Sequence, residues 1–176
     1  MAPEIDIDRM HPKNNPILVG QDDAERQFLS DFASGRLHHT WLITGPKGIG
    51  KATLAYRVAR FILSKSAFQR QSEISLFDEK SDLDAENKEE NYREKLYVPP
   101  ESLIFNSISL GTNPDFLSLE RLLDPQSKKF NNNIPIGNMT NPEKNSARFL
   151  TNFLRKTVSN GGYRVAIIDA VDDLRE

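Results

Sequence analysis

A glycine-rich turn between an apolar segment and a helix-forming segment is the feature that most constrains this fold. The stretch "WLITGPKGIGKATLAYRVARFIL", residues 41–63, fits the phosphate-binding pattern G-x-x-x-x-G-K-[ST] at Gly45, Gly50 and Lys51. In such a loop, backbone N–H groups surround phosphates at a helix N-terminus, and glycines permit the tight curl. We therefore predict a strand over "HTWLIT", a phosphate-binding loop, and a helix from Lys51 to residue 63.

The loop departs from the pattern at the position after the lysine. That residue is Ala52, whereas the pattern requires serine or threonine, whose hydroxyl binds Mg²⁺. Thr53 follows one residue later, about 100° further around the helix, so its hydroxyl should miss the metal. The candidate phosphate-binding residues are Gly45, Pro46, Lys47, Gly48, Ile49, Gly50, Lys51, Ala52 and Thr53. An ordinary glycine-rich turn is the alternative, but it does not explain why Lys51 stands where the motif needs it.

The stretch "YRVAIIDAVDDL" predicts a strand that ends in a second part of the candidate nucleotide site. This near-continuous apolar run is typical of a strand in the centre of a parallel sheet. It ends at Asp169, where related ATPases place the aspartate that holds magnesium through water. The next residue, which is a glutamate in many such ATPases, is Ala170. Hydrolysis needs a positioned metal and water. We therefore expect the chain to bind ATP, to hold Mg²⁺ weakly and to hydrolyse ATP very slowly or not at all. An active P-loop ATPase or kinase is the alternative.

Helical periodicity predicts two helices in the first third of the chain. The first starts near Gln21, with Asp22 or Asp23 as its cap, and ends at Gly35. Its apolar stripe consists of Ala24, Phe28, Leu29 and Phe32. The second follows the loop, and we expect Arg57 and Arg60 to point away from its apolar face. That face consists of Leu54, Val58, Phe61 and Ile62.

The second half of the chain yields further elements. A short helix is predicted within residues 100–110, with Leu103, Ile104 and Ile108 on its buried side. "DFLSLER" alternates apolar and polar residues and predicts a second strand. "TNPEKNSARFLTNFLRKTVSNGG" predicts a helix that is capped at Asn141 and ends at two glycines. Its expected buried face consists of Phe149, Leu150, Phe153 and Leu154.

Composition narrows the possible functions. The net charge of −2 argues against nucleic-acid binding by this chain alone, and the absence of cysteine excludes disulfides and thiolate metal sites. His38 and His39 have no third ligand nearby, so no metal site is predicted. The N-terminus is polar, and no apolar run approaches the roughly 20 residues of a membrane helix. We expect a cytoplasmic protein without membrane contact.

Three stretches of the chain carry a family resemblance. "NPILVGQDDAERQFLSDFASGRLHHTWLITGPKGIGKATLAYRVARFIL", "NPDFLSLERLL" and "GGYRVAIIDAVDDL" resemble the delta prime subunits of the bacterial DNA polymerase III clamp loader, most closely alphaproteobacterial forms. The resemblance covers most of the chain outside residues 64–99 and 124–140. It implies an α/β fold of the P-loop AAA+ type, a three-layer sandwich with a parallel sheet between helices. It also places Val19 and Gly20, in "VGQ", beside an adenine pocket, although a turn before a capped helix explains them equally well.

The resemblance also implies a role in DNA replication. Delta prime is regarded as a largely non-hydrolysing scaffold member of a five-subunit ring in the DNA polymerase holoenzyme, a nucleotidyltransferase complex. The expected partners are the delta and gamma/tau subunits and, through the complex, the sliding clamp and primed DNA. No catalytic residue is predicted in this chain, because the family's trans-acting arginine should lie beyond residue 176.

Departures from the family pattern define the expected domain organisation. Residues 17–63 form the VGQ helix and loop unit, and residues 100–176 form the second strand, a helix and the Asp169 strand. Between them, residues 64–99 replace the family's zinc module, so no zinc is expected. Twelve of the 18 residues in 78–95 are charged and eight are acidic, which predicts a solvated insertion or, alternatively, an acidic interaction surface.

The C-terminal end should leave the AAA+ sheet incomplete, without lid and collar domains. In that sheet a further strand inserts between the loop strand and the Asp169 strand. Without it, we expect either a gap between the two strands or their direct pairing, with an exposed edge and lower stability.

Overall fold

The computed structural model describes residues 11–75, 96–121, 134–135, 146–159 and 162–175. The helices are η1 (Pro12–Asn14), α2 (Asp22–Ala33), α3 (Lys51–Ser75), α5 (Leu103–Ser109), α6 (Ser146–Arg155) and η2 (Val171–Asp173), of which η1 and η2 are 3-10 helices. The strands are β1 (Phe116–Leu119), β2 (Ile134–Pro135), β3 (Val165–Ile168) and β4 (Leu174–Arg175). None of the described helices is long and apolar enough to cross a membrane.

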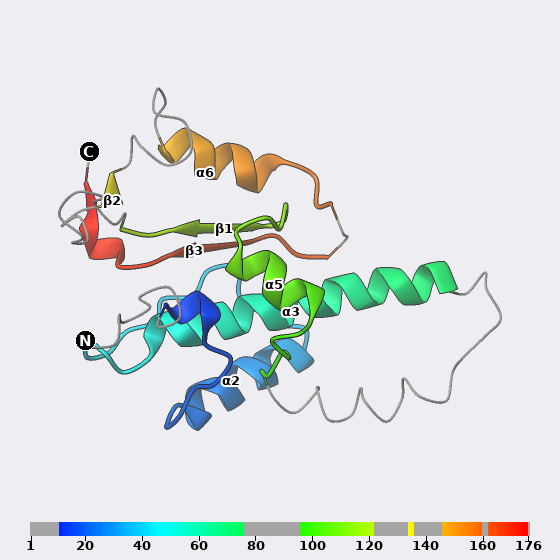
Figure 1. Cartoon of the computed structure of the whole chain (residues 1–176), viewed down its shortest axis with the longest axis horizontal. Coiled ribbons are helices and arrows are strands. Elements are labelled where there is room, and N and C mark those ends of the chain that lie inside the picture. Colours follow the sequence, from blue (N-terminus) through cyan, green and yellow to red (C-terminus); the bar gives the residue numbers. More distant parts are fainter. Residues whose placement is uncertain (1–10, 76–95, 122–133, 136–145, 160–161, 176) are drawn as a thin grey trace, which may run out of the picture.

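A parallel pair of strands lies at the centre of the fold (Figure 1). β1 pairs with β3 in a register that runs from Phe116 opposite Val165 to Leu119 opposite Ile168. The prediction of two strands that belong to a parallel sheet is therefore confirmed. β2 and β4 form a second, two-residue parallel pair.

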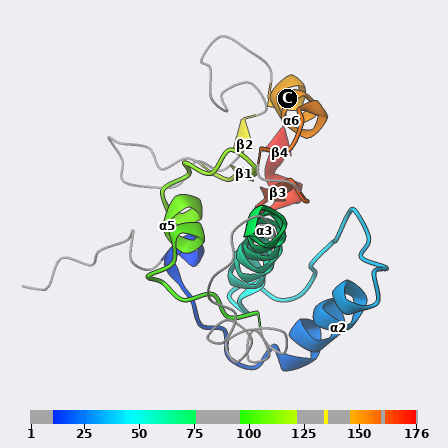
Figure 2. The same ribbon diagram turned by 90° about the vertical axis from the view of Figure 1, so that its right-hand side faces the viewer.

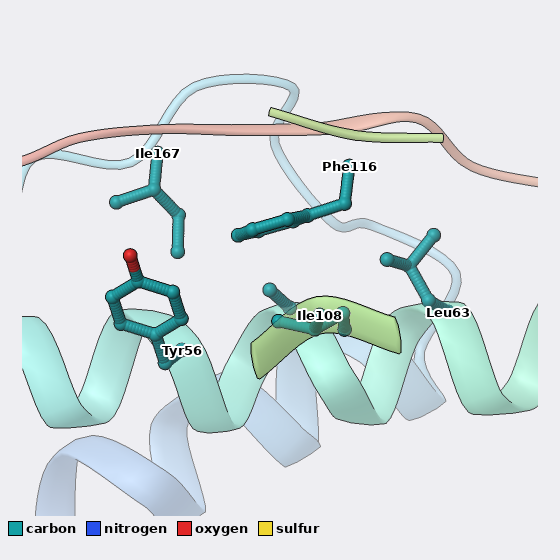
Figure 3. Packing of buried hydrophobic residues seen from close by; sticks show 6 residues of the cluster. Tyr56, Leu63, Ile108, Phe116 and Ile167 are labelled. Carbon is teal, nitrogen blue, oxygen red and sulfur yellow. The ribbon is translucent and has the colours of Figure 1, made fainter. Parts of the chain in front are cut away.

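Helices cover both faces of the β1–β3 pair, as the predicted α/β sandwich requires. In Figure 1, α6 lies above the strands, and α3 and α5 lie beneath them. Beneath the strands, a core cluster joins α3, α5 and both strands through Tyr56, Ala59, Leu63, Ile108, Phe116 and Ile167 (Figure 3). Phe153 of α6 packs on Leu117 and Leu119, which project to the opposite face because side chains alternate along a strand.

α2 lies on the side of α3 away from α5 (Figure 2). Phe28 and Phe61 meet edge to face between the two helices, with ring centroids 6.2 Å apart. The predicted aspartate cap is wrong, since Gln21 precedes the first turn without a capping side-chain hydrogen bond. Asp22 and Asp23 lie in that first turn, where their negative charge faces the positive end of the helix dipole. The predicted end of the helix is confirmed.

α3 is longer than the sequence indicated. It runs from Lys51 to Ser75, beyond the end predicted at residue 63, so residues 64–75 are helical. Ser66 is 3% exposed because residues 162–163 pack against it. The acidic residues 78–95 lie outside the described residues.

The second face of α3 is also buried, which the apolar stripe did not reveal. Arg57 and Arg60 are only 6% and 1% exposed, because residues 11–16 dock against them. Arg60 Nη1 donates to the carbonyl oxygen of Asn15 at 2.9 Å, and Arg57 Nε pairs with Glu25 of α2 at 2.9 Å. Burial, followed by the charge of Arg57, lowers the pKa of Arg60 to about 10. Residues 11–16, which belong to the polar N-terminus, are therefore packed against α3.

The strand predicted over "HTWLIT" is not formed. The segment from Thr40 to Thr44 has no regular secondary structure and pairs with no strand among the described residues. Leu42 is 77% exposed, and Ile43 contributes to the core beside Phe28. The direct pairing of this segment with β3, one of the two expected arrangements, is therefore wrong for the described residues.

Two side chains on the later helices face away from their predicted direction. Leu103 is 87% exposed, and Phe105, at 5%, takes its place in the core of α5. Leu154 of α6 is 54% exposed, whereas Phe153 is buried as predicted. α6 ends at Arg155, several residues before the glycines expected to stop it. Its predicted N-terminal cap at residues 141–143 and the side chain of Phe149 lie outside the described residues.

Candidate functional site

The glycine-rich loop has the tight curl that the phosphate-binding pattern predicts. Gly45, Gly48 and Gly50 have φ angles of 143°, 85° and 98°, a region that residues with a Cβ rarely adopt. α3 begins directly after the loop, and the Leu54 N–H donates to the carbonyl oxygen of Gly50 at 2.9 Å. The curl therefore lies at the helix N-terminus, where backbone N–H groups favour an anion.

Lys51, the residue expected to reach phosphate, contacts the loop itself. Its ammonium donates to the carbonyl oxygens of Gly45 and Pro46, both at 2.8 Å. Lys47, the other loop lysine, is exposed. Lys51 is therefore held by carbonyl oxygens of its own loop.

The residues before α2 pack against the loop, which brings the "VGQ" stretch to the candidate site. Gln21 Nε2 donates to the carbonyl oxygen of Ile49 at 3.3 Å. A Cβ added to Gly50 would lie 2.5 Å from Leu18 Cδ1, so Leu18 rests directly on the loop. Val19 is 84% exposed. The family resemblance placed the "VGQ" stretch, Val19 to Gln21, beside a nucleotide pocket but did not indicate Leu18, whose only signal is its place before that stretch.

The two residues after Lys51 have the character expected from the displaced hydroxyl. Ala52 is half-buried and has no oxygen for a metal. Thr53 is 8% exposed, which places its side chain in the interior. The glycines and Lys51 fit a polyphosphate, whereas the hydroxyl that would bind Mg²⁺ is missing.

Asp169 lies at the carboxyl end of β3, directly after the strand. Its N–H donates to the carbonyl oxygen of Leu119 at 2.8 Å, which extends the β1–β3 pairing by one residue. The carboxyl end of β3 and the N-terminus of α3 lie on the same side of Figure 1. Within the described chain, however, Asp169 and Lys51 form neither a hydrogen bond nor an ion pair. Ala170 follows with a φ of 63°, a left-handed conformation that is unfavourable for alanine.

A polar cluster that sequence analysis missed surrounds the carboxyl end of β1. His11 Nε2 lies 3.0 Å from Glu120 Oε2, and the Tyr56 hydroxyl lies 2.7 Å from Ser118 Oγ. Burial opposes ionisation of Glu120, but the hydrogen bond and charge of His11 contribute to a pKa below its ordinary value. Burial, together with the charges of Glu120 and Asp169, raises the pKa of the Tyr56 phenol. These partners are distant in the sequence, so no local pattern announces them.

The described residues contain no group of three His, Cys, Asp or Glu side chains that could hold a metal ion. His38 contributes a backbone carbonyl oxygen, which accepts a hydrogen bond from Trp41 Nε1 at 3.0 Å.

Comparison with known proteins yields one broad match and two local ones. Residues 20–176 match the family model described as "DNA polymerase III, delta subunit". The DNA polymerase III subunit gamma of Buchnera aphidicola subsp. Schizaphis graminum is 31% identical over 52 residues, 30% of this chain and 14% of that protein. Its counterpart from Buchnera aphidicola subsp. Acyrthosiphon pisum is 37% identical over 43 residues, 24% of this chain and 12% of that protein.

The chain therefore spans only a small part of the length of these two relatives, and no solved structure matches it. The family model, in contrast, covers most of the chain, including the loop, both central strands and Asp169. The chain belongs to the DNA polymerase III clamp-loader family, and its domain is of the AAA+ type.

Proposed function

We propose that the chain acts as the delta prime member of the clamp loader in cytoplasmic DNA replication. In this role it is a largely non-hydrolysing scaffold in the ring that loads the sliding clamp onto primed DNA, and its direct partners are delta and gamma/tau subunits. The observation that carries the proposal is a phosphate loop that keeps its curl and Lys51 but lacks the hydroxyl at position 52 and the carboxylate at position 170.

ATP would be held by the loop and positioned by Lys51. Backbone N–H groups of residues 47–51 would hold the phosphates, and the exposed stretch at Val19 and Gly20 would lie beside the base. Magnesium, when bound, stabilises charge on the transferred phosphoryl group. Asp169 is the carboxylate available to it through water, and Ala52 supplies no second oxygen. Binding should therefore depend little on magnesium.

An active P-loop ATPase is the competing function, because Lys51 and Asp169 are both retained. Reconstitution with delta and gamma/tau subunits separates the two. We expect the protein to co-purify with them and to support clamp loading, while Lys51→Met in this chain leaves the ATP hydrolysis rate of the ring within about twofold. A rate that falls tenfold or more would favour the active ATPase, and failure to co-purify would refute the scaffold role.

A further inference from the structure

The N-terminal arm, residues 11–16, lies against α3 and leads directly into the stretch that touches the phosphate loop. η1, which is part of this arm, packs against both α3 and α5. We infer that Arg60 of α3, by holding the arm in place, positions Val19 and Gly20 for the base of a bound nucleotide. The inference rests on the proposed binding of ATP, and it gives a role to a side chain about two and a half helical turns beyond Lys51.

The burial of Arg60 explains why this side chain can hold the arm. Arg60 is 1% exposed, so its charge needs hydrogen-bond partners inside the protein. Nη1 donates to the carbonyl oxygen of Asn15 at 2.9 Å, and Nη2 donates to that of Lys13. The guanidinium carbon lies 4.0 Å from the centre of the Phe105 ring. Because both acceptors are main-chain oxygens, the guanidinium fixes the backbone path of the arm itself.

Two further side chains hold the arm along the same path. Ser109 of α5 donates from Oγ to the carbonyl oxygen of Lys13 at 2.9 Å. Arg57 Nη1 donates to the carbonyl oxygen of Pro16, the last residue of the arm. The same guanidinium binds both carboxylate oxygens of Glu25 on α2, with Nε and Nη2 at 2.9 and 3.1 Å. Its rigid fork therefore ties the end of the arm to α2.

The arm restrains the stretch beside the loop because few residues separate them. Three residues of extended chain span at most about 10 Å, so a fixed Pro16 confines Val19 to the neighbourhood of the loop. Leu18 and Gln21 contact the loop in this arrangement. A stretch that is held in place before the ligand arrives loses less conformational entropy on binding. Phosphates, in contrast, meet the N–H groups of the loop and the N-terminus of α3, so loss of the anchor should weaken contacts to the base alone.

Isothermal titration of the full chain with ATP and with tripolyphosphate tests this division. Arg60→Met removes the donors and keeps an unbranched side chain. Arg36→Met is the matched control, because it changes the net charge equally and Arg36 is exposed. We expect Arg60→Met to bind ATP about tenfold more weakly than the unmodified chain and to bind tripolyphosphate within about twofold of it. Arg36→Met should bind both ligands like the unmodified chain.

Hydrogen–deuterium exchange without nucleotide tests the anchor separately. The amides of residues 17–21 should exchange about tenfold faster in Arg60→Met and at an unchanged rate in Arg36→Met. Unchanged exchange in Arg60→Met would overturn the inference. If Arg60→Met does not fold, Ser109→Ala removes the other donor to the Lys13 carbonyl oxygen and should weaken ATP about twofold to threefold without changing tripolyphosphate. An unchanged ATP affinity of Ser109→Ala, or an equal change for both ligands, would overturn the inference.

The two ligands also separate this inference from the proposed function. Equal weakening of ATP and tripolyphosphate in Arg60→Met would show that Arg60 supports the fold or the loop and does not position the base stretch. An unchanged ATP affinity would show that the arm has no influence on the base. Either result would overturn the inference and leave the proposed binding of ATP intact. If the unmodified chain binds neither ligand, the proposed nucleotide site is refuted and the inference falls with it.

Discussion

The approach of Gly162 to α3 makes a large loss of stability predictable for one small substitution. Gly162 precedes β3 with a φ of 80°, and a Cβ added there would lie 2.4 Å from Ser66 Oγ and 2.8 Å from Ser66 Cβ. Ser66 cannot simply turn away. Its hydroxyl accepts a hydrogen bond from the Tyr163 N–H at 3.2 Å and donates to the carbonyl oxygen of Ile62 at 3.0 Å.

The magnitude for Gly162→Ala follows from two separate terms. The left-handed backbone disfavours alanine by about 1 kcal/mol. Overpacking against a buried helix residue adds about 1–3 kcal/mol. The free energy of unfolding should therefore fall by about 2–4 kcal/mol, a melting point lower by about 6–12 °C at this chain length. Gly35→Ala is the matched control, because Gly35 has a φ of 67° and nothing within 4 Å of its added Cβ, so only the backbone term applies.

Thermal and urea unfolding of both variants provide the assay. We expect Gly35→Ala to lose about 1 kcal/mol and Gly162→Ala at least twice that amount. Equal losses of unfolding free energy in the two variants would mean that Gly162 does not approach Ser66 of α3 as closely as the added-Cβ distances indicate. No loss in either variant would contradict the backbone term as well.

Three further substitutions are expected to change stability in stated directions. Gly50→Ala should destabilise the chain by about 0.5–1.5 kcal/mol more than Gly48→Ala in urea titrations, because only the former meets Leu18 and the end of that side chain must shift, and equal losses would contradict that contact. Glu120 has a lowered pKa, so its contribution to stability is present above its ordinary pKa of 4.5 and is lost as the pH falls through the lowered value. Glu120→Gln should thus be less stable than the unmodified chain at neutral pH, and the gap should close in acid; a gap that widens would reverse the sign. Ala170→Gly should stabilise the chain by about 1 kcal/mol by relieving a φ of 63°, and destabilisation would argue against that backbone conformation.

Local patterns were sufficient where a single segment determines its own structure. The glycines and Lys51 predicted the curl before α3, and the apolar run ending at Asp169 predicted a parallel strand. Both features depend on neighbouring residues alone: the backbone freedom of glycine in one case, and burial on both faces of a strand in the other.

Features that need a distant partner could not be predicted. Arg57 and Arg60 lie off the apolar stripe of α3, and distant partners make their burial favourable: the carbonyl oxygens of residues 13–16 and the carboxylate of Glu25. The segment before Gly45 has the composition of a strand, yet a strand forms only beside another strand.

The candidate site likewise has some features that a local pattern predicts and others that depend on distant residues. The motif states that a lysine follows Gly50, but it does not state that the lysine donates to Gly45 and Pro46. That Thr53 lies about 100° around the helix from position 52 follows from the helical repeat alone. The cluster around Glu120 was not predictable, since it joins the N-terminal arm, α3 and β1.

Isothermal titration with ATP, with and without Mg²⁺, and a parallel measurement of hydrolysis test the central claim most directly. A loop that keeps Lys51 but lacks the oxygen at position 52 predicts an affinity that changes by less than about tenfold when Mg²⁺ is added. It also predicts hydrolysis no faster than that of the Lys51→Met variant. Tight binding that requires Mg²⁺, accompanied by turnover that Lys51→Met abolishes, would contradict the account.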